Sequence, residues 1–188
     1  MVAKADLGAI FKYVMIGLGV LHLLIGILAV VECVREGVTL GDIFPSVKDS
    51  SFSISMLPPT FTPFLVGAIC LVFAFIPIYY IIIPIILLGL IESGLFLWTM
   101  IKIFDFESDL AKMKDPLAIA FLLILMQISL EEMKDRMETL EGIYVFNKVI
   151  CGMGIFVGVA TIAVAAFLAF KHRPGGGGSR SFSSTATS

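Results

Sequence analysis

The longest apolar run of the chain extends from Phe61 to Phe104 and is about twice as long as one crossing of a bilayer requires. Its only acidic side chain is Glu92, and its only basic side chain is Lys102, near the far end. A transmembrane helix needs about 20 apolar residues, so the run predicts two helices joined by a turn. Proline removes a helical donor, and tyrosine prefers the membrane interface. We therefore place the turn at Pro77–Tyr80, between helices over residues 61–76 and 81–104.

Two further apolar stretches predict one membrane helix each, over residues 9–31 and 145–170. The first follows Lys4 and exceeds the apolar core of a secretory signal, which has about 7–15 residues. No small-x-small cleavage site stands out before Cys33, so we expect this helix to be retained. The last helix ends at Lys171, and the Gly-rich and Ser-rich residues 172–188 predict a disordered tail.

The segment between the third and fourth predicted spans carries a helix of its own, over residues 116–141. Pro116 suits the first turn of a helix, and Gly142 is a typical helix stop. Apolar side chains repeat there at spacings of four and three, as in a heptad seam, at Met126, Leu130, Met133, Met137, Leu140 and Tyr144. The part from Leu117 to Ile128 is apolar on nearly every side but reaches only ~18 Å. We expect it to pack on the outer face; the alternative is that it crosses, which gives five spans.

These elements predict an all-α integral membrane protein, a four-transmembrane-helix bundle with a helical extramembrane segment between the third and fourth spans. Residues 1–8 form a cytosolic stub and residues 9–171 the membrane domain. Residues from Arg35 to Pro59 read as an irregular loop. Both termini are predicted to be cytosolic, because Lys4, Lys12 and Lys171 flank the outer helices. Four basic residues between the third and fourth spans point the other way, namely Lys112, Lys114, Lys134 and Arg136.

Composition agrees with membrane residence and excludes several functions. The mean hydropathy is +1.03 and only 15% of the residues are charged, against about 25% in soluble domains. A net charge of −2 gives no basic surface for nucleic acid. Three dispersed cysteines form neither a disulfide framework nor a zinc motif. No hydrolase, zinc-protease, phosphate-loop or haem motif occurs. We therefore expect that the protein is not an enzyme and binds no metal or cofactor. We expect it in the plasma membrane or in an internal membrane.

Glu92 and His22 are the intramembrane polar candidates, because each falls near the middle of a predicted span. An ionised carboxylate inside a bilayer costs about 2.5–3.5 kcal/mol on insertion scales, so Glu92 should face the interior of the bundle. His22 is its expected partner. Two interpretations remain open: a bond that holds helices together, which we favour, and a relay for protons or cations.

Small residues predict where helices approach one another closely. Gly154 and Gly158 form a G-x-x-x-G pattern in the last helix, and Gly17, Gly19 and Gly26 provide small positions in the first. Small residues let backbones touch in lipid, where the hydrophobic effect does not drive association. We expect these glycines to bring the first and last helices together.

The order of the helices, with a polar residue in the third, resembles tetraspan proteins such as the tetraspanins. The chain departs from that family because the segment from Asp105 to Gly142 holds no cysteine, so its Cys-Cys-Gly signature is absent. The hypothesis is a non-enzymatic organiser, trafficking scaffold or accessory subunit. It would contact lipids and other membrane proteins, or itself, through Met133, Met137 and Leu140. The alternative is a small transporter or channel that uses Glu92 and His22.

Overall fold

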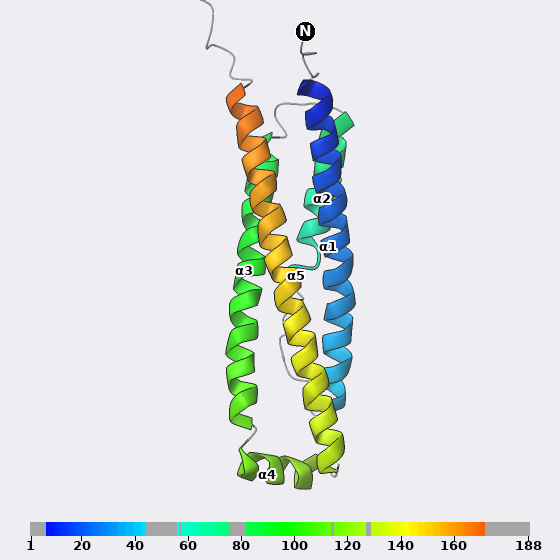
Figure 1. The fold of residues 1–188 in the computed structure, drawn as a ribbon, viewed down its shortest axis with the longest axis vertical. Coiled ribbons are helices and arrows are strands. Elements are labelled where there is room, and N and C mark those ends of the chain that lie inside the picture. Colours follow the sequence, from blue (N-terminus) through cyan, green and yellow to red (C-terminus); the bar gives the residue numbers. More distant parts are fainter. Residues whose placement is uncertain are drawn as a thin grey trace, which may run out of the picture.

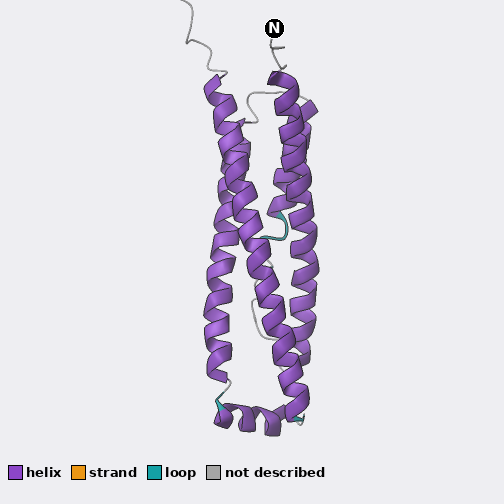
Figure 2. Ribbon diagram, in the orientation of Figure 1, coloured by secondary structure: helices purple, strands orange, loops and turns teal. Residues whose placement is uncertain are grey.

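The computed structural model describes residues 7–43, 56, 58–75, 82–113, 115–126 and 129–171, and every regular element among them is a helix. No strand occurs in these ranges (Figure 2). The helices are α1 (Leu7–Ile43), α2 (Thr62–Phe75), α3 (Ile82–Met113), α4 (Pro116–Met126) and α5 (Leu130–Lys171). This confirms an all-helical fold.

The three long helices run along the whole molecule; α1 and α3 run in one direction, and α2 and α5 run in the other (Figure 1). α2 accompanies only one half of α1, the half in which α1 begins and α5 ends. α4 lies across the opposite end of the bundle. Contacts are most extensive between α1 and α2 and between α3 and α5. We name these the α1–α2 pair and the α3–α5 pair.

Buried side chains recur at spacings of three and four along each long helix, which is the repeat of left-handed helix packing. On α1 this buried stripe consists of Met15, Leu18, His22, Ile25, Ala29, Glu32, Glu36 and Leu40. On α5 it runs through Met133, Met137, Leu140, Tyr144, Asn147, Cys151, Gly154, Gly158, Thr161, Ala165 and Leu168. The predicted heptad seam therefore continues along almost the whole of α5.

Three helices are long and apolar enough to cross a membrane, over Ile10–Asp42, Ile82–Asp109 and Leu130–Phe170, so the chain is a membrane protein. α2 has only 14 residues. At 1.5 Å per residue this is about 21 Å, less than the ~30 Å of a bilayer core. Length alone therefore does not make α2 a complete span.

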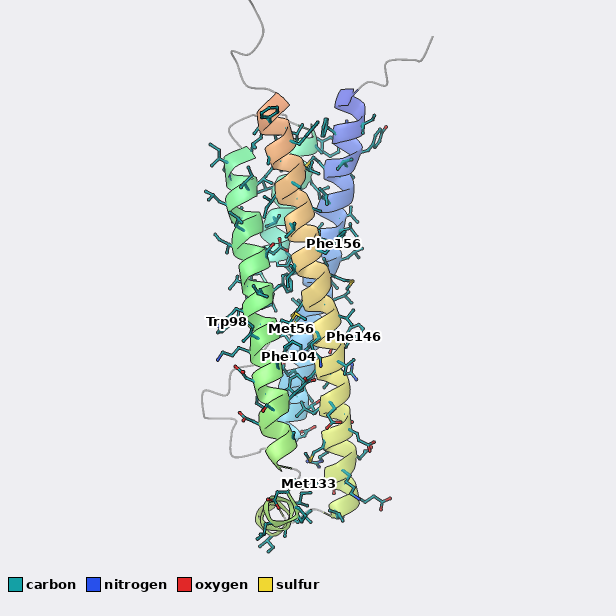
Figure 3. The ribbon with its side chains drawn as sticks, turned by 60° about the vertical axis from the view of Figure 1, so that its left-hand side comes forward. Met56, Trp98, Phe104, Met133, Phe146 and Phe156 are labelled. Carbon is teal, nitrogen blue, oxygen red and sulfur yellow. The ribbon has the colours of Figure 1, made fainter. Side chains whose placement is uncertain are left out.

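The outward surface changes character at one level along the bundle. On α3, the exposed side chains from Ile83 to Phe104 are apolar apart from Lys102, and exposed acidic residues begin at Asp105. On α5, no charged side chain occurs from Val149 to Phe170. Trp98, Phe104, Phe146 and Phe156 project from this surface, which we name the apolar band (Figure 3).

Two helices are longer than predicted. α1 continues to Ile43 instead of ending at residue 31, and α3 continues to Met113 instead of 104. The expected loop therefore begins no earlier than residue 44. The physical reason is burial: Glu36 and Leu40 extend the buried stripe of α1, and Phe106, whose ring centre lies 5.3 Å from that of Tyr144, extends the packed face of α3. Packing of this kind outweighs the weak helix propensity of Gly37 and Gly41.

The boundary between α4 and α5 also differs from the prediction. One helix was expected to stop at Gly142, but α5 passes through this residue, which is exposed with open space around it. The break comes earlier, at Ser129, whose hydroxyl accepts a hydrogen bond from the amide of Glu132 at 3.1 Å. Ser129-x-x-Glu132 is thus the cap that begins α5. Pro116 begins α4 as predicted, with Asp115 accepting the amide of Leu117 at 3.1 Å.

The five-span alternative requires the segment after Pro116 to run along the bundle. α4 has 11 residues, about 16 Å of helix, and lies across the end instead. The stub was predicted to extend to residue 8, whereas α1 begins at Leu7. The predicted turn at Pro77–Tyr80, residues 1–6 and the tail over 172–188 lie outside the described residues.

Candidate functional site

In the half of the bundle that contains α2, each of the four helices α1, α2, α3 and α5 buries one polar residue at a common level. His22 on α1, Cys70 on α2, Glu92 on α3 and Thr161 on α5 are all 0% exposed. We name these four the polar layer. Gly67, three residues before Cys70, lies against α1 at this level, since a Cβ there would be 3.2 Å from the Cβ of His22. The layer therefore brings together side chains that are 139 residues apart in sequence.

His22 is the centre of the layer. Its Nδ1 lies 2.9 Å from Oε1 of Glu92, and its Nε2 lies 2.8 Å from Oγ1 of Thr161. The Thr161 hydroxyl in turn donates to the backbone carbonyl of Val157 at 2.9 Å. The second carboxylate oxygen of Glu92 has no hydrogen-bond partner among the described residues. One imidazole thus links α1 to both helices of the α3–α5 pair.

A glycine three residues before each polar residue explains how the four helices come so close. Gly19 precedes His22, Gly67 precedes Cys70, Gly89 precedes Glu92 and Gly158 precedes Thr161. A Cβ on Gly67 would lie 2.8 Å from the carbonyl oxygen of Gly19, and a Cβ on Gly89 would lie 3.4 Å from that of Gly158. Each helix pair therefore has one crossing at which two glycines face each other.

The order of groups in the layer is that of a nucleophile, a base and an acid, as in Ser-His-Asp enzymes. Acyl transfer also needs donors for an oxyanion and room for a substrate. Thr161 lies inside a long helix, where backbone amides are already bonded to carbonyls four residues back. In the described ranges no three His, Cys, Asp or Glu side chains are placed to hold a metal ion. The arrangement is suited to sharing a proton.

A second buried polar cluster lies farther along the same interface. It consists of Glu32 and Glu36 on α1 and Tyr144 and Asn147 on α5, and we name it the boundary cluster because the apolar band ends here. The Asn147 amide donates to Glu36 at 3.4 Å, and the Tyr144 hydroxyl hydrogen-bonds to the same carboxylate. The cluster lies 14 residues, about 21 Å, from the polar layer along both helices.

Neighbouring contacts tie this level of the bundle together. Lys148 donates to Glu107 of α3 at 2.6 Å, and its ammonium lies 5.3 Å from the centre of the Phe104 ring. The thiol of Cys151 lies 3.9 Å from the sulfur of Met56, which is fully buried among the helices (Figure 3). Residues that precede α2 therefore contribute to the core where α2 itself is absent.

The structure brings His22 and Glu92 together, as expected from the sequence, but it gives the glycines different partners. Gly19 faces Gly67 and Leu71 of α2, Gly26 faces Phe64 of α2, and Gly154 faces Phe96 of α3. They do not join α1 to α5. Gly17 is exposed, and a Cβ on it would meet nothing within 4 Å. The glycines act within pairs because the contacting faces of α1 and α5 carry larger residues such as His22 and Glu36.

The proposed partner-binding side chains lie inside the protein. Met133 is 4% exposed, Met137 8% and Leu140 0%. They are therefore not an exposed surface for another protein. Their seam is internal, because α1 and α3 extend beyond the predicted spans and cover it.

Sequence reasoning missed Cys70, the boundary cluster, and Gly67 and Gly89. A signal for Cys70, Gly67 and Gly89 was present, since the pattern Gly-x-x-polar recurs in four helices. For Glu32 and Glu36 the signal was the continued spacing of three and four after Ala29, which a predicted loop obscured. Comparison with protein families, curated proteins and solved structures finds no match to this chain.

Proposed function

We propose that the chain is a non-enzymatic tetraspan membrane protein that organises or accompanies other membrane proteins through the end of its bundle that carries α4. The observation that carries the proposal is α4 itself. Leu117 is 81% exposed and Ile124 79% exposed on a helix without a single charged residue. An apolar helix in water is unfavourable, since burying one such side chain is worth about 1.5–3 kcal/mol. A partner that covers α4 would recover this free energy.

A fourth crossing through α2 is supported by the chain that precedes it. Pro59 and Thr60 are buried and Met56 is 0% exposed, so this segment follows the interior of the bundle. The ~9 Å that α2 lacks corresponds to about three residues of extended chain, at 3.3–3.6 Å per residue. Non-helical backbone is tolerated at membrane depth where protein covers it. Four crossings would leave both termini on one side, the arrangement in which α1 begins and α5 ends together (Figure 1).

A projecting extramembrane end is supported by the distribution of charge. From Leu130 to Tyr144, α5 exposes Glu131, Glu132, Lys134, Asp135 and Glu138. These fifteen residues correspond to about 22 Å of helix beyond the apolar band. α4 would therefore lie too far from the chain's own bilayer to be covered by it, which leaves another protein, or a second copy, as its partner.

Site-specific photo-crosslinking in native membranes tests the proposal. A photoreactive residue at Leu117 or Ile124 should give protein adducts that depend on ultraviolet light. The matched control is Ser108, which is exposed at the same end of the bundle but belongs to α3. With the photoreactive residue at Ala120, which is also exposed on α4, the double substitution Leu117→Glu and Ile124→Glu should abolish the adducts, whereas Ser108→Glu should leave them unchanged. Equal adducts at Leu117 and Ser108 would count against an organiser of this kind.

Transport through Glu92 and His22 is the second candidate function. The unpartnered Glu92 oxygen in the middle of the bundle supports it. The occupied ring nitrogens of His22 argue against it, since a relay must exchange partners. Proton or cation flux into proteoliposomes, lost on Glu92→Gln, would establish transport. Flux equal to that of empty vesicles would exclude it.

A further inference from the structure

The hydroxyl of Thr161 determines where protons lie in the polar layer. This hydroxyl has one proton, and it donates that proton to the carbonyl of Val157, four residues earlier on α5, at 2.9 Å. Toward His22 it is therefore an acceptor. The ring nitrogen Nε2, 2.8 Å away, must carry a hydrogen. The Nε2–H form of His22 follows from this geometry.

A second proton follows from the contact between His22 and Glu92. Nδ1 of the ring lies 2.9 Å from Oε1 of the carboxyl group. An unprotonated nitrogen and an ionised carboxylate would be two acceptors facing each other, which is repulsive. One of them must hold a proton, giving either an imidazolium beside a carboxylate or a neutral ring beside a carboxylic acid. Both states contain the same number of protons and carry no net charge.

We infer that the polar layer is a proton-binding site, in which one proton is held between Glu92 and His22 and fastens the α1–α2 pair to the α3–α5 pair. The ligand is the proton itself. This site does not depend on the role proposed for α4.

The remaining groups around the site favour the presence of the shared proton, which leaves the layer without net charge. α2 contributes Cys70 and α5 contributes Thr161, and both are neutral; beside Glu92, Ser93 is neutral as well. Lys12 and Lys102 are the nearest basic residues along α1 and α3. Each is ten residues, about 15 Å, from the layer, and each ammonium lies over an aromatic ring. A net negative charge at the layer would therefore have no described cation beside it, inside a bundle that excludes water.

Loss of the proton would change the contact between the two helix pairs. His22 belongs to one pair, and Glu92 and Thr161 belong to the other. Without the shared proton, two acceptors would face each other across this interface, and α1 would move away from α3. The glycine crossings inside each pair do not involve this proton, because the atoms that meet there belong to no titratable group. The proton thus acts on the junction of the pairs and leaves each pair intact.

The nitrogen resonances of His22 test the assignment. The chain has two histidines, so the full-length protein with His172→Gln, labelled with ¹⁵N-histidine in lipid nanodiscs, reports His22 alone. At neutral pH we expect Nε2 to be protonated and Nδ1 to share a proton. In Glu92→Gln the amide can donate to Nδ1, so Nε2 should stay protonated and Nδ1 should no longer change with pH. An unprotonated Nε2 at neutral pH in the protein without the Glu92 change would overturn the assignment.

Distances between the pairs test the coupling. Genetically encoded spin labels at Leu24 and Ile91, both exposed, measure α1 against α3; labels at Ile91 and Val159 measure α3 against α5. When alkaline pH removes the Nδ1 proton, the first distance should increase and the second should stay constant. Glu92→Gln should abolish the increase, whereas Glu107→Gln, an acid of α3 outside the layer, should not. Proton loss without a change in the first distance, or a resonance that never titrates before unfolding, would overturn the coupling.

Discussion

Within the α1–α2 pair, Gly19 and Gly67 let two backbones touch, and Gly89 and Gly158 do the same within the α3–α5 pair. Between the pairs, His22 bonds to Glu92 and Thr161, and Asn147 bonds to Glu36. The Arg136 guanidinium also donates to the backbone carbonyl of Asp42. At the glycine crossings the helices of each pair meet by close approach, whereas these polar contacts join one pair to the other.

This difference has a physical consequence. A glycine crossing gains dispersion energy from close backbones and holds no group that titrates. A buried hydrogen bond is directional and depends on protonation, so it specifies which surfaces meet and under which conditions. The two kinds of interface should respond differently to substitution.

The largest effect should come from removing His22 or Glu92, whose buried contact joins the two helix pairs. His22→Leu leaves Glu92 buried without its partner, and breaking a buried pair on one side costs about 3–5 kcal/mol. Reversible unfolding in mixed micelles measures this loss. The double variant His22→Leu with Glu92→Leu should recover much of it, because no polar group is then left alone. A double variant as unstable as the single one would contradict this account.

A smaller loss should follow from blocking a crossing within a pair. Gly67→Leu forces a side chain against the backbone oxygen of Gly19, which cannot move aside as a flexible side chain would. Overpacking of this kind costs about 1–3 kcal/mol, measured by the same unfolding transition. Gly17→Leu is the matched control, since Gly17 has open space around it and should be nearly neutral. Equal losses for both variants would mean that the crossing is not close.

Lys148→Met should have a modest effect within the α3–α5 pair. The ion pair of Lys148 with Glu107 is 2.6 Å long, but the two side chains are 24% and 28% exposed. Exposed pairs contribute about 0–1 kcal/mol and are screened by salt. A double-mutant cycle with Glu107→Gln should give a coupling free energy in this range that decreases with added salt. A coupling that does not change with salt would indicate a drier contact than the structure describes.

A gain of similar size should come from the exposed side of α5. Gly142 lies on the exposed side of α5, where a Cβ would meet nothing. Gly142→Ala should therefore raise the free energy of unfolding by about 0.5–1 kcal/mol, since glycine is the weaker helix former. The same change at Gly67 should be destabilising. A loss of stability at Gly142 would show that α5 bends or breaks there.

Much of the helical content was predictable, because membrane helices are marked by apolar length. Their ends were less predictable. Arg35 and Glu36 look like the start of a polar loop, yet α1 continues through them because Asn147 of α5 bonds to Glu36 and Leu40 is buried. Gly142 looks like a stop, whereas the actual boundary is capped by Ser129. Local signals compete with packing at such positions, and packing prevails where a neighbouring helix is available.

The candidate site was predictable in its strongest member only. Glu92 is recognisable from the sequence, because a carboxylate inside a span must find a partner. His22 was the polar residue available at a similar depth. Cys70 has no such requirement, because a thiol is tolerated in an apolar helix; its one signal was the Gly-x-x-polar pattern that it shares with three other helices. Asn147 and Glu36 were placed in separate elements and could not be paired. Their contact depends on the antiparallel alignment of α1 and α5, which no local pattern contains.

The sequence by itself determined that the chain is helical and membrane-embedded, because both properties follow from the composition and period of short stretches. Only the tertiary structure decided which glycine meets which, that Met133 and Met137 face inward, and that one histidine joins three helices. The physical reason is that these contacts depend on the relative rotation and depth of helices far apart in the sequence, and many alignments satisfy the same apolar pattern.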